Sequence, residues 1–154
     1  MAKHLLIVYH TQTGNTERLA EAALAGARDP LIEDVEVRYL RAAAAGPNDL
    51  LWAHALLLGT PENFGYMSGG MKDFLDRTFY PVEGRIHSLP YAVFISAGND
   101  GSGALRAIRR IGNGYPFSEV AEPVIAQGEI REEDIDKARE LGMTLAAGLD
   151  AGIY

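Results

Sequence analysis

Short apolar runs alternate along the chain with longer stretches in which apolar residues recur every three or four positions. A continuous apolar run of four to eight residues is typical of a strand buried on both faces, and the wider spacing is typical of a helix with one buried face. The runs predict strands at residues 5–9, 35–40, 55–59, 91–96 and 120–126. The spaced stretches predict helices at residues 15–28, 48–52, 70–79, 104–111 and 132–149.

Prolines and one asparagine set the expected ends of several elements. Pro30 closes the first helix, Pro81 is expected to stop the third, and Asn48 is expected to cap the second. Pro123 interrupts the last strand and favours an edge position for it. No tight-turn sequence joins two strands, so we expect no hairpin.

Strands and helices that alternate in this way predict βαβ crossovers, and therefore a parallel sheet with helices on both faces. Right-handed crossovers leave only a few doubly wound strand orders. No repeat, low-complexity linker or change in composition divides residues 1–154, so we expect a single domain. Ligands of such sheets bind beyond the carboxyl ends of the strands. The loops after the first, third and fourth strands are therefore the candidate site.

The loop after the first strand carries hydroxyl and amide side chains immediately before a helix. Free backbone N–H groups at a helix N-terminus bind anions, and hydroxyls add donors. The loop has no Lys or Arg and no Gly-rich polyphosphate or dinucleotide pattern, which fits a single phosphate monoester. Helix capping by Thr13 or Asn15 is the alternative. The candidate phosphate-binding residues are Thr11, Gln12, Thr13, Gly14, Asn15 and Thr16.

The loop after the third strand places Phe64, Tyr66 and Met67 among glycines. Aromatic side chains on a long loop favour contact with a flat ligand, unless Phe64 and Met67 fold back into the core. The loop over residues 96–103 has three glycines and no aromatic residue, so its backbone can approach a ligand edge, unless it is only a flexible turn. The three loops together match a planar heterocycle that bears one phosphate.

Charge and composition narrow the range of partners. Fourteen Lys and Arg residues against 21 Asp and Glu give a net charge of −7, which disfavours a nucleic-acid partner. The chain has no cysteine, so disulfides and thiolate chemistry are excluded, and a cytoplasmic protein is expected. His4, His54 and His87 have no metal-ligand spacing, so we expect no metal site. No apolar run reaches 18 residues, and the run at residues 5–9 reads as a strand rather than a signal peptide.

At the three loops the sequence resembles the flavodoxin-like flavoproteins, and among them the NAD(P)H:quinone oxidoreductases of the tryptophan-repressor-binding-protein type. The first match is Thr-Gln-Thr-Gly-Asn-Thr-Glu at residues 11–17. The second covers residues 59–78, with a fairly specific Thr-Pro-x-x-Phe-Gly core, and the third is Ser-Ala-Gly-Asn-Asp-Gly at residues 96–101. The C-terminal helix is also similar, so the resemblance covers nearly the whole chain.

The resemblance implies a flavodoxin-like α/β fold, with a five-stranded parallel sheet in the order 2-1-3-4-5. It also implies noncovalent FMN, with the phosphate in the first loop and backbone N–H groups near Asn63 and Phe64 on the ring. The second loop would contribute Thr60, Pro61, Glu62, Asn63, Phe64 and Gly65. The third loop would contribute Ser96, Ala97, Gly98, Asn99, Asp100 and Gly101.

The implied activity is hydride transfer from NAD(P)H to FMN, and then electron transfer to a quinone, a flavin or a similar acceptor, without a covalent nucleophile from the protein. An oligomer of at least two subunits is expected. The chain departs from the family in lacking an insertion that helps to build a tetramer. Residues 112–118 also do not reproduce the family's longer loop with substrate-contacting histidine and aromatic residues.

Two other functions compete with the reductase. A flavodoxin-type one-electron carrier would suit the acidic charge. Carriers usually sandwich the flavin between two aromatic residues; residues 96–103 offer no second one, although Tyr115 or Phe117 could supply it. A flavin-free receiver or scaffold domain would leave the three loops unexplained.

Overall fold

The computed structural model describes residues 1–154. The strands are β1 (Lys3–Tyr9), β2 (Val35–Arg41), β3 (Ala55–Asn63), β4 (Tyr66–Met67), β5 (Leu89–Ala97), β6 (Phe117–Glu119) and β7 (Val124–Gln127). The helices are α1 (Asn15–Ala27), α2 (Pro47–Trp52), α3 (Gly69–Val82), α4 (Ser102–Gly114) and α5 (Glu132–Asp150), with a short 3₁₀ helix η1 (Ala42–Ala44). No helix is both long enough and apolar enough to cross a membrane.

The sheet has the predicted topology. Its main path runs β2-β1-β3-β5-β6, and all the neighbours on this path are parallel. β7 also pairs with β5 in parallel, further along the same strand. The order 2-1-3-4-5 and the doubly wound fold class are therefore confirmed, with β6 and β7 sharing the fifth position.

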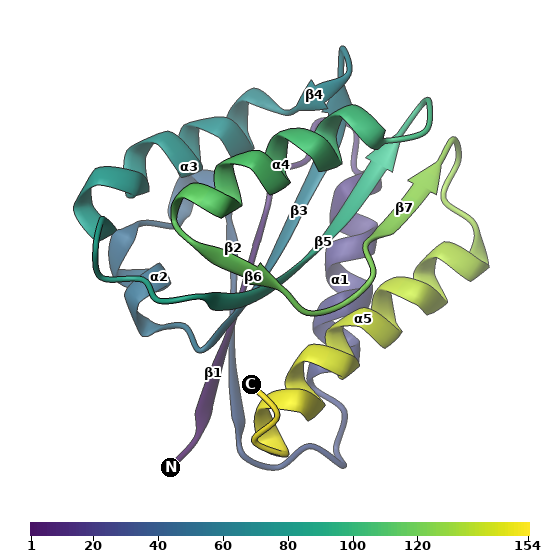
Figure 1. Cartoon of the computed structure of the whole chain (residues 1–154). Helices are drawn as coiled ribbons and strands as arrows, with labels where there is room; N and C mark the ends of the chain where they lie inside the picture. Colours follow the sequence, from purple (N-terminus) through teal and green to yellow (C-terminus); the bar gives the residue numbers. More distant parts are fainter.

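Helices cover both faces of the sheet, and each face has its own core (Figure 1). One core lies under α1 and α5, and the other under α2, α3 and α4. The continuous apolar runs of β1, β3 and β5 supply both cores, because successive strand residues point to opposite faces. α1 and α5 pack closely, since Gly26 lies against the backbone of Arg139 and Gly142 against that of Ala23.

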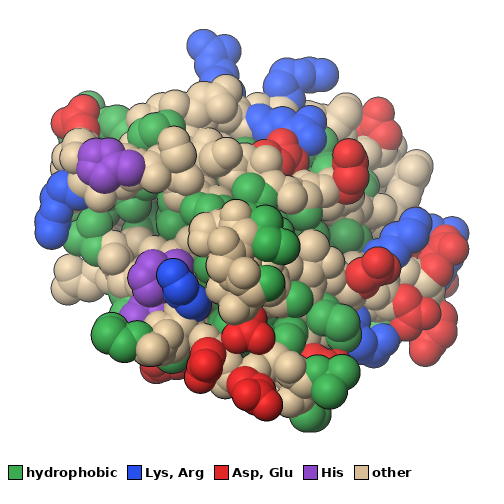
Figure 2. All heavy atoms as spheres, turned by 60° about the horizontal axis from the view of Figure 1, so that its bottom comes forward, with side chains coloured by type: hydrophobic (Ala, Val, Ile, Leu, Met, Phe, Trp, Pro, Cys, Tyr) green, Lys and Arg blue, Asp and Glu red, His purple; other side chains and the backbone are tan.

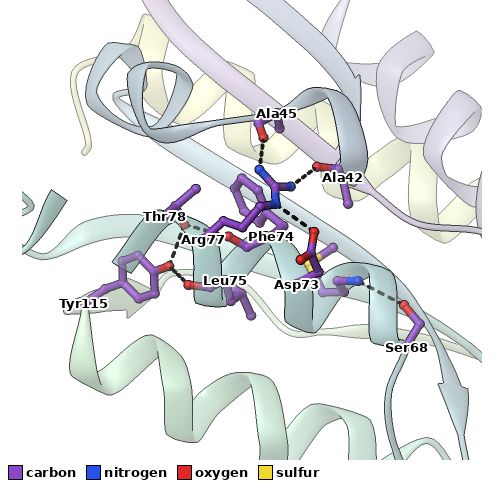
Figure 3. Close-up of polar contacts among 10 residues, drawn as sticks. Ala42, Ala45, Ser68, Asp73, Phe74, Leu75, Arg77, Thr78 and Tyr115 are labelled. Carbon is purple, nitrogen blue, oxygen red and sulfur yellow. Dashed lines mark hydrogen bonds and ion pairs between the residues drawn. The ribbon is translucent and has the colours of Figure 1, made fainter. Parts of the chain in front are cut away.

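Polar contacts fix α3 in its place (Figure 3). The Ser68 hydroxyl caps the helix by accepting from Met71 N–H at 3.3 Å. The Arg77 guanidinium donates to the carbonyls of Ala42 and Ala45, at 2.9 and 3.1 Å, and so holds the segment that follows β2. In the middle of α3, the Leu75 carbonyl accepts a hydrogen bond from the Tyr115 hydroxyl at 2.6 Å.

Several element boundaries differ from the expectations. β3 and β4 form a short antiparallel hairpin, although no hairpin was expected. α3 continues through Pro81, which lies in its last turn, so Pro81 does not stop the helix. α2 begins at Pro47 after Gly46, and Asn48 therefore lies within the helix and is not its cap. The expected strand at residues 120–126 is wrong in extent, because Pro123 separates β6 from β7.

The two ends of the sheet differ in character. The carboxyl ends of the central strands lie at the top of Figure 1, together with the hairpin and the loops before α1 and α4. Figure 2 shows the opposite end, where histidine side chains gather. His4 stacks on Trp52 and on His54 there, with ring centroids 4.2 and 4.8 Å apart. These two histidines therefore lie at the opposite end of the sheet from the candidate site.

Candidate cofactor site

The three predicted loops meet around one cavity of about 350 Å³ at the carboxyl ends of the strands. Hydrogen bonds between side chains join them. Asn63 of the hairpin donates to the side-chain carbonyl of Gln12 in the first loop. The Thr16 hydroxyl lies 2.7 Å from that of Ser96, which joins the start of α1 to the end of β5. The cavity is lined by Gln12, Thr13, Asn15, Pro61, Glu62, Asn63, Ser96, Ala97, Gly98, Gly128 and Glu129.

The first loop offers a cluster of backbone donors that the protein itself leaves unused. Gly14 is the N-cap of α1, with φ +100°, and no side chain caps the helix. The alternative that Thr13 or Asn15 caps α1 is therefore wrong. The Gly14 N–H is held by the Thr11 hydroxyl at 3.0 Å. The N–H groups without an acceptor in the protein belong to Thr11, Gln12, Thr13, Asn15, Thr16 and Glu17.

This donor set fits a phosphate group. Free N–H groups at a helix N-terminus, together with the helix dipole, stabilise an anion without a cationic side chain. No Lys or Arg lines the cavity. Arg41, at the end of β2, is bound instead to Glu17 at 2.8 Å, and Glu17 also accepts from the Tyr9 hydroxyl at 3.1 Å. Main-chain amides are thus the main source of positive potential at this end of the cavity.

The second loop is the β3–β4 hairpin, and its tip reaches into solvent. Phe64 and Gly65 both have positive φ, 51° and 72°, as a tight two-residue turn requires. Phe64 is fully exposed and Tyr66 is 43% exposed, whereas Met67 is buried. Of the two residues that could fold back, only Met67 does so. The Phe64 N–H has no acceptor in the protein and is free to bind the edge of a ring.

Two side chains of the second loop form hydrogen bonds that hold the hairpin in place. Thr60 is completely buried, and its hydroxyl donates to the Pro61 carbonyl at 2.8 Å and accepts from Ser68 N–H at 3.0 Å. The Glu62 carboxylate accepts from the N–H groups of Gly103 and Ala104, at 3.0 and 3.1 Å. Glu62 therefore caps α4 and fixes this helix to the hairpin, while Thr60 does not reach the cavity.

The third loop brings backbone, and no aromatic ring, to the cavity. Ser96, Ala97 and Gly98 line it, and the Gly98 N–H has no acceptor. The Asp100 carboxylate turns back to accept from the backbone and hydroxyl of Ser102, at 3.0 and 2.8 Å. Gly101 is buried against Ile125 and does not line the cavity.

His10 lies behind the first loop. Its Nδ1 atom is buried without a hydrogen-bond partner, and its ring packs on Gly70. Burial, and then the positive charge of Arg41, lower the pKa of His10 from its ordinary value. The ring does not line the cavity, so it supports the loop rather than the ligand.

Sequence reasoning missed a fourth segment of the site. Gly128 and Glu129 follow β7 and line the cavity, and Gly128 N–H donates to the Ala97 carbonyl at 2.7 Å. Gly128 also has a positive φ of 77°. The signal was present, because the loop after the fifth strand lies at the same sheet edge by the rule that selected the other three.

A doubly wound sheet with a phosphate-type donor cluster at its first loop defines a flavodoxin-like protein. Residues 42–122 match the family described as NADPH-dependent FMN reductase, and the chain belongs to this family. This membership confirms the prediction of a flavodoxin-like FMN protein.

The individual relatives are named either as flavodoxins or as NAD(P)H dehydrogenases (quinone). A flavodoxin of Aquifex aeolicus is 38% identical over 99 residues, which cover 64% of this chain and 52% of that protein. The chain thus spans about half the length of this relative. An NAD(P)H dehydrogenase (quinone) of Syntrophus aciditrophicus is 30% identical over 172 residues, covering 94% of this chain and 84% of that protein. A solved flavodoxin from the domain Archaea has a TM-score of 0.81 at 21% identity, over 95% of this chain and 98% of that one, which shows the fold.

The alignment with the Syntrophus protein bears on the expected insertion. It extends over 172 positions, more than the 154 residues of this chain. The relative therefore carries inserted residues that this chain lacks.

Proposed function

We propose that the chain is an FMN-dependent oxidoreductase that accepts a hydride from NAD(P)H and passes electrons to a quinone, a flavin or a similar small acceptor. Membership of the NADPH-dependent FMN reductase family supports this reading, as does the name of the Syntrophus relative. The observation that carries it is the absence of an aromatic ring on the third-loop side of the cavity.

The absence of an aromatic ring on this side of the cavity distinguishes a reductase from a one-electron carrier. The two residues that could have supplied a second aromatic wall are Tyr115 and Phe117, which are only 2% and 5% exposed. They stack on each other beneath α4, and the Tyr115 hydroxyl bonds Thr78 at 2.7 Å (Figure 3). Neither residue lines the cavity. One face of a ring bound there stays open, as a nicotinamide needs for contact with it.

The residues of the cavity have distinct roles in this proposal. The free N–H groups of residues 11–17 hold the FMN phosphate, with the hydroxyls of Thr11 and Thr13 as further donors. The Phe64 and Gly98 N–H groups, which have no acceptor in the protein, would hold the edge of the ring. Thr16 and Ser96 position these loops through their mutual hydrogen bond.

The protein's part in the reaction is alignment and electrostatics. Bound FMN supplies the hydride and electron chemistry, which belongs to the cofactor. Backbone N–H groups beside the ring stabilise negative charge that develops on it, because fixed dipoles need no reorganisation. Because no aromatic residue covers the third-loop side of the cavity, that side would admit the nicotinamide and the acceptor in turn, as a ping-pong sequence requires. No side chain is required as a nucleophile.

Anaerobic mixing tests the proposal. The purified chain is loaded with FMN, freed of excess flavin, and mixed with NADPH or NADH in a stopped-flow spectrophotometer. We expect two-electron bleaching of the bound flavin by at least one nucleotide, followed by reoxidation when a benzoquinone is added. The carrier function of a flavodoxin predicts a different result, namely no reduction by either nucleotide and a stable one-electron radical during stepwise dithionite titration.

The proposed assembly and location need separate tests. We infer at least a dimer, because the exposed Phe64 and Tyr66 leave apolar surface beside the cavity that a second subunit can cover. Sedimentation of the FMN-loaded protein tests this, and a monomer at all concentrations would contradict it. A cytoplasmic location stays a prediction.

A further inference from the structure

The outer face of α4 carries three arginines, and two of them form no ion pair within the protein. Arg109 is held by Glu119 through two hydrogen bonds of 2.8 and 3.0 Å. Arg106 and Arg110 are exposed and have no carboxylate partner among the ion pairs of the protein. Two free guanidinium groups four residues apart on a helix are neighbours on its surface.

These arginines line a shallow groove of about 480 Å³ that contains no acidic residue. The protein as a whole has a net charge of −7, so a local basic surface is a departure from its average. Lys and Arg side chains gather along the top of Figure 2, over α4. The groove is lined by Ser102, Leu105, Arg106, Arg109, Arg110 and Asn113.

The groove starts at Ser102, which follows the third loop, and Gly98 of that loop lines the cofactor cavity. Ser102 is the first residue of α4 and is bonded to Asp100 of the third loop. At a rise of 1.5 Å per residue, Arg106 and Arg110 lie roughly 6 and 12 Å along the helix from Ser102. The cap from Glu62 keeps this helix fixed relative to the cavity.

We propose that Arg106 and Arg110 bind the 2′-phosphate of NADPH, with the nucleotide lying along α4 and its nicotinamide on the open face of the cofactor cavity. Guanidinium groups bind phosphate with paired, charge-assisted hydrogen bonds. Guanidinium planes also stack on aromatic rings, and Leu105 adds apolar surface to the groove, which suits adenine. NADH lacks the 2′-phosphate, so the groove makes the enzyme selective for NADPH. The inference rests on the proposed function and adds to it the residues that would select the nucleotide.

The test compares two double variants that lose the same charge. The groove variant, Arg106→Ala with Arg110→Ala, removes both free guanidinium groups from the groove. The control variant, Arg28→Ala with Lys137→Ala, removes two exposed cations elsewhere that have no ion-pair partner. Calorimetry with 2′-AMP and 5′-AMP on the FMN-loaded protein measures the site without any redox step. KM for NADPH and for NADH measures selectivity.

We expect the wild type to bind 2′-AMP more tightly than 5′-AMP, and the groove variant to lose that preference. We also expect KM for NADPH to rise by about ten-fold or more in the groove variant, the scale of losing a charge-assisted bond, with KM for NADH unchanged. An equal rise in the control variant, or wild-type binding that does not distinguish 2′-AMP from 5′-AMP, would overturn the proposal. If 2′-AMP binding behaves as expected but neither nucleotide reduces the flavin, the proposed function fails and the phosphate site stands.

Discussion

At the scale of single residues, Gly14 has the conformation on which the phosphate loop depends. Its φ of +100° lies in the region that other residues enter only at a cost of about 1–2 kcal/mol. No atom lies within 4 Å of where a Cβ would stand, so this cost is conformational and not a clash within the protein. The positive φ turns the chain so that the following N–H groups point toward one region of space.

We therefore expect Gly14→Ala to weaken FMN binding by about 1–2 kcal/mol, because the loop must recover its conformation before it binds. Fluorescence titration of the apoprotein measures the change. Gly46→Ala is the control, since Gly46 also has open space around it but has no positive φ. Equal affinities of Gly14→Ala and wild type would show that the phosphate binds elsewhere.

Which polar groups face the cavity is the part of the site that sequence could not predict. Thr13 and Thr16 look alike in the sequence, yet Thr13 is exposed at the cavity and Thr16 is buried against Ser96. Glu62 was expected beside the ring and also caps α4. A hydroxyl or carboxylate can serve a ligand or the protein's own backbone with the same chemistry, and only the packing decides between them.

At the scale of elements, strands and helices were predicted well where apolar runs were continuous, as in β1, β3 and β5. The hairpin was missed because its turn is Phe-Gly, whereas the usual two-residue turn has Asn, Asp or Gly first. Pro81 was misread because a proline in the last turn of a helix removes only one hydrogen bond near an end that is already incomplete. Local sequence patterns thus predicted the presence of a helix or strand better than they predicted the residue at which it ends.

The contact between α1 and α5 provides a prediction at this scale. A Cβ on Gly142 would collide with the Ala23 carbonyl of α1, so Gly142→Ala must push two helices apart. We expect a loss of about 1–3 kcal/mol in the free energy of unfolding, measured by urea denaturation. Gly114→Ala, at the open end of α4, is the control and should be neutral or stabilising. A Gly142→Ala protein as stable as the control would contradict this close packing.

At the scale of the whole molecule, the strand order and the position of the site follow from a few general rules. Right-handed crossovers between buried parallel strands restrict the order, and the carboxyl edge then receives every loop that precedes a helix. Loops far apart in the sequence, such as those containing Gln12 and Asn63, are joined there by a hydrogen bond. A ligand that contacts all of them links the stability of the entire fold to its own concentration.

FMN at 100 times its dissociation constant should therefore stabilise the folded protein by about 2.7 kcal/mol, and its removal should reverse this. Urea midpoints with and without FMN measure the effect. Riboflavin, which has the ring and no phosphate, should stabilise much less at the same concentration. Equal stabilisation by riboflavin would mean that the amides of the first loop contribute nothing to binding.

The fifth position of the sheet is divided between β6 and β7, with Pro123 in the gap. This division affects the tendency of the protein to aggregate. An uninterrupted outer strand offers unpaired amides and carbonyls on which another polypeptide can add a strand, and this is a common beginning of aggregation. Here that border consists of three residues in β6 and four in β7, separated by a segment around a proline. Neither β6 nor β7 is long enough to pair stably with a strand of another molecule. This edge of the sheet therefore resists the growth of intermolecular sheets at high concentration.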